Sequence, residues 1–460
     1  MVSHSINSQA NLVEQYSSAT VIGLGVTGYS VARYLLSRGF HVTVMDSRAL
    51  PPLASEFKRE FPKVETIFGA FDPEAVIADD LIVASPGVSL KEPLLREAKR
   101  NGAHIVGDIE LFLQENTQPV IAVTGSNGKS TVVTLVGEMC QDNGLTTLVA
   151  GNIGKPALDA LTDGRQYDIA VLELSSFQLE TTYQVPAQSA AILNISADHM
   201  DRYDSMGDYV LAKARILRGA QRAILPSHDE WLQQITNANK VTNFELEQPA
   251  NDADFGMVRK SNGRWLTKGD NKLMRVRDIP LIGLHNVKNV LSAFALVDFL
   301  NLPLEGLVET VKKFKGLAHR MQTVVKNRGV LWVNDSKATN IGATSTALSS
   351  LEESVIWIAG GQGKGADFNE LRHSVSGNVK QLILIGEDAG KIEKALNGLL
   401  PITCSRDLAA AVDVAADAAV RGDVVLFSPA CASFDMYQNF ERRGEAFIEC
   451  VERKLVRGAS

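Results

Sequence analysis

The chain opens with short apolar runs that alternate with segments of helical spacing. The apolar runs lie within 19–25, 41–46, 80–87 and 103–108. Residues 27–39 place apolar side chains at helical spacing and end on a glycine, as helices often do. This alternation predicts a parallel sheet with helices on both faces. We expect the first block to end near Gly107.

The middle of the chain repeats the alternation. Residues 119–131 are predicted to form a strand that runs into a loop, and 131–144 the helix that follows. Further strands are expected at 167–175, 189–196 and 222–226. Alternation around Asn262-Gly263 predicts a β-hairpin, and 281–300 predicts a turn followed by a long helix.

The last part has the same pattern. Strands are expected at 330–335, 355–361, 381–386 and 423–429, and a helix over 407–422 that ends in Arg-Gly. We predict three α/β domains in series, at 1–107, 108–317 and 318–460. Each should hold a mostly parallel, doubly wound sheet, with the first and third domains Rossmann-like and the central one like a phosphate-loop ATPase.

Composition narrows the class of protein. The 460 residues are 45 % hydrophobic and 22 % charged, as in ordinary globular proteins. A net charge of −7 argues against a nucleic-acid partner. The N-terminus lacks the apolar core of a signal peptide, and no run approaches the ~18 apolar residues of a membrane helix. We therefore expect a cytoplasmic protein without membrane insertion. The four cysteines form no CxxC pair and indicate no zinc site.

Two glycine loops are candidates for binding phosphates. The first, GLGVTG at 23–28, follows a strand and opens a helix, and Asp46 ends the next strand, where a ribose-reading carboxylate is usual. By itself this loop fits a nicotinamide or flavin site and a ligand-free tight turn equally well.

The second loop, TGSNGKST at 124–131, carries more information. Its Gly125 and Gly128 allow backbone amides to wrap an anion, Lys129 can reach terminal phosphates, and the Ser130 hydroxyl can bind a phosphate-bound magnesium. The full phosphate-loop pattern would need glycine at Val123. We predict that ATP binds here and that the first loop holds something else.

Three further side chains are weighed between a functional and an ordinary structural role. Glu173 ends a predicted strand beside the second loop, where it could bind magnesium, activate water or simply be solvated. A lone histidine such as His199 is more often packed or at the surface than functional. Lys213 lies on a helical pattern, where a solvated lysine is the default.

A set of longer motifs resembles one family. GSNGKST, GNIG, ELSSFQLE, DHMDRY, GLHNVKN, NDSKATN, GGQGKGADF and SPACAS occur in this order. Together they resemble the ATP-dependent Mur ligases of peptidoglycan synthesis, and the resemblance extends from about Val21 to Phe447. DSR after the second strand, SPG, GDIELF and SPACASFDMYQNFERRGEAF resemble the members that add D-glutamate to UDP-N-acetylmuramoyl-L-alanine.

The resemblance implies a reaction and a location for each substrate. ATP activates a carboxylate as an acyl phosphate, and the amine of D-glutamate then displaces phosphate. The first domain would hold the UDP-substrate without redox chemistry. The matching positions are Gly25, Val26, Thr27, Asp46, Ser47, Arg48 and Gly87, with Asn152 and His199 nearer the reacting end.

The resemblance also implies the other ligand positions. The ATP positions are Gly125, Ser126, Asn127, Gly128, Lys129, Ser130 and Thr131 of the loop, with Asn286, Asn289, Arg320, Asp335 and Lys337. Ser130 and Glu173 would bind one magnesium, and His199 and a carbamylated Lys213 a second. The catalytic set would be Lys129, Glu173, His199 and Lys213. The D-glutamate positions are Thr339, Lys364, Ser433 and Phe440. A monomer is expected. Gln362 and Phe434 depart from the family pattern near this pocket.

Two other functional classes are weighed against this one. A nicotinamide oxidoreductase would use GLGVTG but leave TGSNGKST without a role. A phosphate-loop switch or transport ATPase would use the second loop but not the third domain with its DSKATN and SPACAS motifs.

Overall fold

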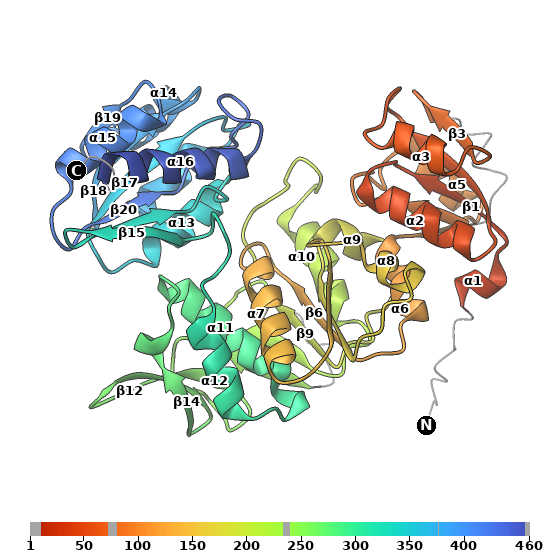
Figure 1. Cartoon of the computed structure of the whole chain (residues 1–460), viewed down its shortest axis with the longest axis horizontal. Helices are drawn as coiled ribbons and strands as arrows, with labels where there is room; N and C mark the ends of the chain where they lie inside the picture. Colours follow the sequence, from red (N-terminus) through yellow and green to blue (C-terminus); the bar gives the residue numbers. More distant parts are fainter. Residues whose placement is uncertain (1–10, 72–80, 233–239, 376, 456–460) are drawn as a thin grey trace. The chain divides into compact units, whose positions relative to one another are not determined.

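Three β-sheets organise the chain in a computed structural model (Figure 1). The structure describes residues 11–71, 81–232, 240–375 and 377–455. The chain groups into two compact units. Unit 1 comprises Met1–Ile195, His199–Phe244 and Ser292–Leu307, and unit 2 comprises Ser196–Asp198, Glu245–Leu291 and Val308–Ser460. The three-domain α/β architecture is confirmed, whereas the boundaries at 107 and 317 stay predictions.

The N-terminal sheet has the strand order β3-β2-β1-β4-β5, and every pair in it is parallel. Its strands are β1 Ser18–Ile22, β2 His41–Asp46, β3 Glu65–Phe68, β4 Leu81–Ala84 and β5 His104–Val106. The helices are α1 Leu12–Gln15, α2 Val26–Ser37, α3 Ala54–Glu60 and α5 Pro93–Arg100. Alternate strand residues fill two cores: Val21, Val44 and Val83 share one with α2, and Ile22 and Ile82 share the other with α5. The sheet is therefore doubly wound, as predicted.

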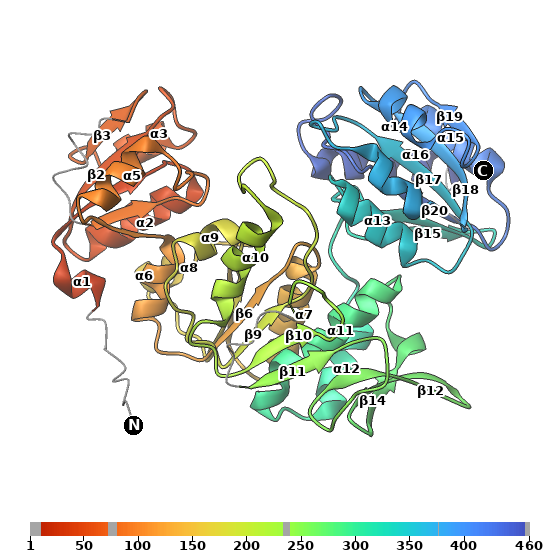
Figure 2. The same cartoon turned by 180° about the vertical axis from the view of Figure 1, so that it is seen from behind.

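The central sheet of unit 1 has the order β11-β10-β9-β6-β8-β7, also parallel throughout. Its strands are β6 Val120–Thr124, β7 Thr147–Gly151, β8 Ile169–Glu173, β9 Ser189–Ile192, β10 Ala223–Pro226 and β11 Val241–Phe244. The associated helices are α6 Asp108–Glu115, α7 Lys129–Asp142, α8 Ala157–Thr162, α9 Ser176–Glu180, α10 Met206–Ala214 and η1 Arg215–Leu217. Figure 2 shows β9, β10 and β11 side by side.

Polar contacts join the N-terminal and central domains inside unit 1. Helices α2 and α8 pack together, and Ser30 Oγ donates to Asp159 Oδ1 at 2.6 Å while Arg33 pairs with Asp163 at 2.6 Å. The N–H of Gly107, at the predicted boundary, donates to the carbonyl of Thr181 at 3.1 Å.

The first strands of unit 2 form an antiparallel meander at the end of the nine-stranded sheet. The strands are β12 Phe255–Lys260, β13 Gly263–Lys268 and β14 Asn271–Arg275. The predicted hairpin is confirmed, but Lys260 pairs with Gly263, so the turn consists of Ser261 and Asn262. The long helix expected at 281–300 is α11 Leu284–Val297, followed by η3 Asp298–Leu300 and α12 Leu304–Lys313.

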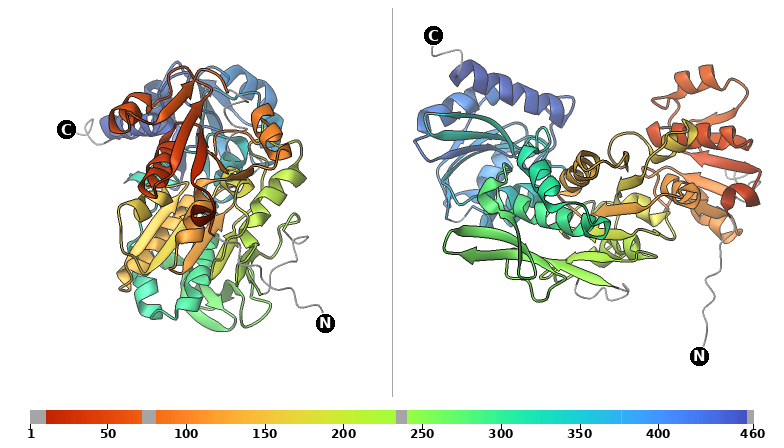
Figure 3. Two further views of the ribbon diagram at one scale, coloured as in Figure 1. Left: turned by 90° about the vertical axis from the view of Figure 1, so that its right-hand side faces the viewer. Right: turned by 60° about the horizontal axis from the view of Figure 1, so that its bottom comes forward.

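The C-terminal sheet has the order β15-β16-β20-β17-β18-β19, in which only the β15–β16 pair is antiparallel. Its strands are β15 Gln322–Asn327, β16 Val330–Asn334, β17 Val355–Gly360, β18 Val379–Ile385, β19 Ile402–Cys404 and β20 Val424–Phe427. The helices are α13 Ile341–Ser349, η4 Phe368–His373, α14 Ala389–Leu396, α15 Leu408–Ala418 and α16 Phe440–Leu455, the last drawn in dark blue across one side of the sheet in Figure 3. Two separate cores on its faces confirm the doubly wound prediction.

One predicted helix end is wrong. The helix over 407–422 ends at Ala418, because Ala419 is extended, with ψ 135°. The next N–H, that of Val420, donates to the carboxylate of Asp423 at 2.9 Å, so the Arg-Gly pair belongs to a turn that leads into β20. Within the described part of the chain, no helix is long and apolar enough to cross a membrane.

Candidate active site

The second glycine loop joins β6 to α7 in unit 1. Gly125 has φ 153°, and Gly128 has φ 83°, a left-handed conformation that glycine adopts at little cost. Gly128 is also the N-cap of α7, so the backbone amides that follow lie at a helix N-terminus, where anions bind. Val123 is fully buried inside β6, paired with Glu173 of β8. The chain is still extended strand at this position, so the missing glycine is not needed.

Two residues that the sequence did not reveal hold this loop in shape. The N–H of Asn127 donates to Asn194 Oδ1 at 2.9 Å, and Asn194 Nδ2 donates back to the carbonyl of Asn127 at 3.0 Å. Ser126 Oγ lies 3.0 Å from the hydroxyl of Tyr209 on α10. One sequence feature could have pointed to Asn194: it comes just after β9, and parallel strands end at the same sheet edge as the loop.

Two lysines converge on one backbone oxygen of the loop. Lys129 Nζ and Lys213 Nζ each donate to the carbonyl of Gly125 at 2.8 Å. Lys213 is 2 % exposed, so the solvated lysine expected by default is wrong: it lies on the buried face of α10. The two nitrogens are at most twice 2.8 Å apart. As two ammonium groups they repel by about 3 kcal/mol at an effective dielectric of 20.

Glu173 brings a negative charge to the same place. It ends β8 beside the strand that leads into the loop, which confirms the predicted position. Its side chain is 2 % exposed, Oε1 accepts a 2.9 Å hydrogen bond from Asn152 Nδ2, and Oε2 is buried with no hydrogen-bond partner among the described residues. A buried carboxylate oxygen without a donor is costly, so a cation at this position would satisfy it.

His199 lies in an exposed loop after β9. Its φ is 58°, which is unusual for a residue other than glycine, and such outliers cluster at functional sites. Its ring lies 4.8 Å from the ring of Phe177 on α9. The exposed imidazole can therefore accept a ligand, as the functional interpretation requires.

The first glycine loop joins β1 to α2. A Cβ on Gly28 would lie 1.8 Å from the carbonyl oxygen of Gly23, so this position requires glycine. Gly25 is different, because a Cβ there would meet nothing within 4 Å. The open space in front of Gly25 lies at the N-terminus of α2, where a diphosphate would be favoured. Val26 beside it is exposed, and Thr27 is half-buried.

Asp46 and Arg48 form a bidentate pair next to this loop. Asp46 Oδ1 accepts from Arg48 Nε at 2.9 Å, and Asp46 Oδ2 accepts from Arg48 Nη2 at 2.6 Å and from the N–H of Leu24 at 2.8 Å. Burial alone would raise the pKa of Asp46, but the hydrogen bonds from Arg48 and Leu24 outweigh it and hold the pKa below its usual value. Asp46 thus supports the loop, while Ser47 and half of the Arg48 side chain are exposed.

Unit 2 holds the remaining predicted ATP residues. Asn286 and Asn289 are joined by a 3.0 Å hydrogen bond on α11. Asp335 accepts from the N–H of Met321 at 3.1 Å and from Ser428 Oγ at 2.9 Å, and burial raises its pKa to about 7. Lys337 Nζ lies 3.9 Å from the centre of the Phe440 ring. Arg320 is half-buried and follows His319, whose φ is 62°.

The predicted D-glutamate residues also lie in unit 2. Lys364 is exposed, has φ 51° and places Nζ 4.8 Å from the ring centre of Phe434, one of the two departures from the family pattern. Gln362, the other, pairs through its backbone with Ala432. Thr339 is half-buried, and Ser433 is 2 % exposed.

A residue that the sequence did not reveal connects these segments. Arg443 on α16 is fully buried, and burial lowers its pKa to about 10. Its Nε donates to Ser336 Oγ at 3.1 Å and its Nη2 to the carbonyl of Ser336 at 2.9 Å, while Ser336 Oγ donates to the carbonyl of Phe440. Within the described part of the chain, no cluster of three or more histidine, cysteine, aspartate or glutamate residues is arranged to hold a metal.

Comparison with known families gives matches in each of the three sheet regions. Residues 17–107 match the Mur ligase MurD-like, N-terminal domain, residues 123–297 the Mur ligase middle domain, and residues 319–431 the Mur ligase, glutamate ligase domain.

Similar proteins cover nearly the whole chain. A UDP-N-acetylmuramoylalanine–D-glutamate ligase of Methylobacillus flagellatus is 46 % identical over 436 residues, which are 94 % of this chain and 96 % of that protein. The protein of the same name from Pseudomonas aeruginosa is 43 % identical over 437 residues, 94 % of this chain and 97 % of that one. Among solved structures, MurC, the UDP-N-acetylmuramate-alanine ligase of Thermotoga maritima, has a TM-score of 0.56 at 16 % identity, covering 95 % of this chain and 100 % of that chain. MurF from Acinetobacter baumannii also has a TM-score of 0.56 at 16 % identity, covering 95 % and 92 %.

Proposed function

The chain belongs to the Mur ligase family, and from this we propose that it joins D-glutamate to UDP-N-acetylmuramoyl-L-alanine while ATP is converted to ADP and phosphate. It is an ATP-dependent ligase of peptidoglycan precursor synthesis. A carboxylate oxygen of the UDP-substrate attacks the γ-phosphorus of ATP, and ADP leaves. The amine of D-glutamate then attacks the acyl carbon, loses a proton, and phosphate leaves as the amide bond forms.

The observation that carries this proposal is the charge arrangement at the second glycine loop. Lys129 Nζ and Lys213 Nζ both donate to the loop, and Glu173 Oε2, which has no hydrogen-bond partner in the described part of the chain, lies buried beside it. Phosphoryl transfer to a carboxylate brings two anions together, so catalysis depends on charges that are already in position. The other glycine loop, with its open Gly25, is free to take the UDP-substrate instead of a redox cofactor.

The residues present fit magnesium at this loop. Ser130 and Glu173 would hold one ion, because a hydroxyl and a buried carboxylate oxygen are the hard oxygen ligands that magnesium prefers. His199 and Lys213 would hold a second. When bound, the ions would neutralise negative charge on the phosphates and on the acyl phosphate. The Lys129 ammonium could stay paired with the γ-phosphoryl group while this group moves from ATP to the carboxylate.

Lys213 can serve a metal only if its positive charge is removed. We propose that Nζ first loses a proton to become a neutral amine, which attacks carbon dioxide; an N–C bond forms, a second proton leaves the nitrogen, and the product is an anionic carbamate. Lys129 and Lys213 share the Gly125 carbonyl, so their two ammonium groups repel each other. The Lys129 ammonium would instead attract the anionic carbamate of a modified Lys213.

On the amino-acid side, Lys364 supplies the cation that a D-glutamate carboxylate requires. Thr339, Ser433 and Phe440 are proposed to line the same pocket, and Arg443 is linked to Phe440 through its hydrogen bonds with Ser336. The cytoplasmic location and the monomeric state remain predictions.

A phosphate-release assay tests the function. Purified protein with ATP and magnesium is combined with UDP-N-acetylmuramoyl-L-alanine and, in turn, D-glutamate, L-glutamate, L-lysine and diaminopimelate. We expect phosphate release and amide product with D-glutamate only. Comparable turnover with diaminopimelate would overturn the assignment within the family. ATP hydrolysis that needs neither the UDP-substrate nor an amino acid would favour a phosphate-loop ATPase.

A further inference from the structure

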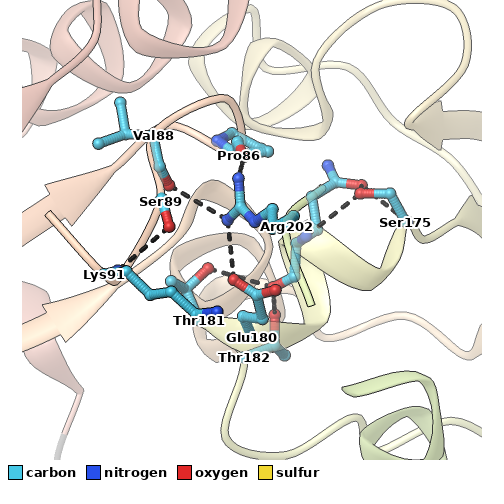
Figure 4. A network of polar contacts seen from close by, with 10 residues as sticks. Pro86, Val88, Ser89, Lys91, Ser175, Glu180, Thr181, Thr182 and Arg202 are labelled. Carbon is cyan, nitrogen blue, oxygen red and sulfur yellow. Dashed lines mark hydrogen bonds and ion pairs between the residues drawn. The ribbon is translucent and has the colours of Figure 1, made fainter. Parts of the chain in front are cut away.

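Arg202 reaches from the central domain into the N-terminal domain (Figure 4). It follows His199 by three positions, and its own N–H donates to the carbonyl of His199 at 2.9 Å. Its guanidinium donates from Nη1 to the carbonyl of Pro86 at 2.9 Å and from Nη2 to the carbonyl of Val88 at 3.2 Å. These two carbonyls flank Gly87, so a single side chain holds both ends of this turn.

The same guanidinium is fixed from the other side by helix α9. Arg202 Nη2 donates to Glu180 Oε2 at 2.8 Å, and its Cζ lies 4.1 Å from the centre of the Phe177 ring. The arginine and glutamate side chains are only 11 % and 16 % exposed. Water and salt therefore screen this pair less than a surface ion pair. Arg202 Nε has no hydrogen-bond partner among the described residues, so the guanidinium is held by its hydrogen bonds to Pro86, Val88 and Glu180 and by the Phe177 ring.

Each end of this connection leads to a proposed ligand site. On one side, the N–H of Val88 donates to the carbonyl of Ser85, and Ser85 Oγ donates to the carbonyl of Gly23 in the first glycine loop at 2.8 Å. On the other side, the Phe177 ring that Arg202 covers is the ring in contact with His199. Arg202 thus lies between the loop proposed for the UDP-substrate and the loop proposed for metal and acyl phosphate.

We infer that Arg202 is a positioning residue that sets the placement of the UDP-substrate loop relative to the reacting centre. The inference rests on the proposed function. The substrate is held in one domain and reacts in another, so a small error in this placement moves its carboxylate away from the γ-phosphate. Misplacement by about 1 Å can lower a rate about 100-fold without changing how tightly the distant end of the substrate binds.

Only arginine can make this set of contacts. The planar guanidinium presents donors in two directions to two carbonyls and a carboxylate, and it stacks on an aromatic face. A lysine ammonium could keep the charge and the pair with Glu180, but not both ends of the Pro86–Val88 turn. Arg202→Lys therefore separates the positioning role from the charge.

The experiment compares Arg202→Lys with Lys91→Ala and Arg33→Ala. Lys91 lies in segment 85–91, which Arg202 contacts, and forms an exposed ion pair with Asp204. Arg33 also joins the two domains, through an exposed ion pair with Asp163. For Arg202→Lys we expect kcat to fall at least about 20-fold, while the Kd of UDP alone and the KM of ATP stay within about twofold. Exposed pairs contribute little, so both control variants should keep kcat within about twofold.

Hydrogen exchange provides a second measurement that does not need substrate. Arg202→Lys should exchange faster in segment 85–91, with no change in the C-terminal sheet. Normal kcat, or unchanged exchange in 85–91, would overturn the inference. A loss of kcat with equal weakening of UDP and ATP binding and a lowered unfolding midpoint would overturn it as well, because that pattern indicates a general structural role. Wild-type protein that releases no phosphate with D-glutamate would instead overturn the proposed function, while exchange in 85–91 would still report on the contact.

Discussion

At the scale of single residues, the centre of the second loop is defined by charges that the fold holds close together. Lys129 and Lys213 share the carbonyl of Gly125, and one buried oxygen of Glu173 has no donor among the residues that the structure describes. Such an arrangement is unfavourable in the absence of ligands and becomes favourable when anionic phosphates and cations arrive. Charges that are already in position can stabilise a phosphoryl-transfer reaction without rearrangement, which makes these residues candidates for catalysis.

Replacing Lys213 tests its proposed modification. We expect Lys213→Ala to lose at least about 100-fold in kcat and to retain ATP binding through Lys129. Acetate or formate should restore part of the activity by supplying the missing carboxylate. Lys213→Arg keeps a permanent cation that carbon dioxide does not modify, so it should stay inactive. Steady-state assays check this, and near-normal turnover of either variant would contradict the proposal.

Asp335 predicts a particular pH dependence of stability. Burial raises its pKa to about 7, so its contribution to folding is fully present below the ordinary carboxyl pKa and is lost as pH rises through about 7. In Asp335→Asn this dependence should disappear. Urea unfolding at pH 5 and pH 8 should show that the wild type loses roughly 1–3 kcal/mol more stability than the variant between the two values. Asp108, whose pKa burial raises to about 6, is present in both proteins and cancels. If wild type and Asp335→Asn lost the same stability between pH 5 and pH 8, Asp335 would already be ionised in the folded protein at pH 5.

At the scale of secondary-structure elements, each glycine loop combines a strand end with a helix start. Two of the three glycines of the first loop, Gly25 and Gly28, have different tasks. Gly28 allows α2 to approach β1, since a Cβ would lie 1.8 Å from the oxygen of Gly23, whereas Gly25 faces open space. One glycine is therefore structural, and the other is available for a ligand.

Alanine at the two positions should separate these tasks. We expect Gly28→Ala to lower the free energy of unfolding by roughly 2–4 kcal/mol, because α2 must move away from β1. Gly25→Ala should change it by less than about 1 kcal/mol, since its φ of −97° suits any residue. Thermal or urea unfolding measures both. Equal destabilisation would show that the loop is not divided in this way.

At the scale of the whole molecule, two phosphate-binding loops are assigned to two different ligands. The N-terminal and central domains share unit 1, yet each has its own glycine loop and parallel sheet. The reaction then needs both loops, which a redox enzyme or a simple ATPase would not.

A bulky side chain at Gly25 tests this assignment. Gly25→Val should raise the KM of the UDP-substrate at least about tenfold by filling the space where a diphosphate would bind, and it should leave the KM of ATP within about twofold. Thermal shifts provide an independent readout: UDP should stabilise the wild type but not the variant, and ADP should stabilise both. An equal effect on both ligands, at unchanged folding, would show that the two loops do not act separately.

Some features of this protein are determined locally, and the sequence alone was sufficient for them. Alternating strand and helix patterns predicted the parallel sheets. Gly125 and Gly128 predicted the turn before α7, because backbone conformation at glycine and the start of a helix depend on neighbouring residues. The position of Glu173 followed from parallel strands ending at one edge of a sheet. The resemblance to a family then assigned roles that local pattern could not.

Other features were decided only by the tertiary structure. Lys213 looked like a surface lysine, and only the packing of α10 brought it to Gly125, 88 positions earlier in the chain. Arg202 and Arg443 stand inside motifs that carry the family resemblance, but nothing near them or near Asn194 in sequence indicates their contacts. Their partners lie 116, 107 and 67 residues away, respectively. The physical reason is the same in each case. A side chain's charge and hydrogen-bonding groups are written in the sequence, but its burial and its partners depend on which distant segments pack beside it.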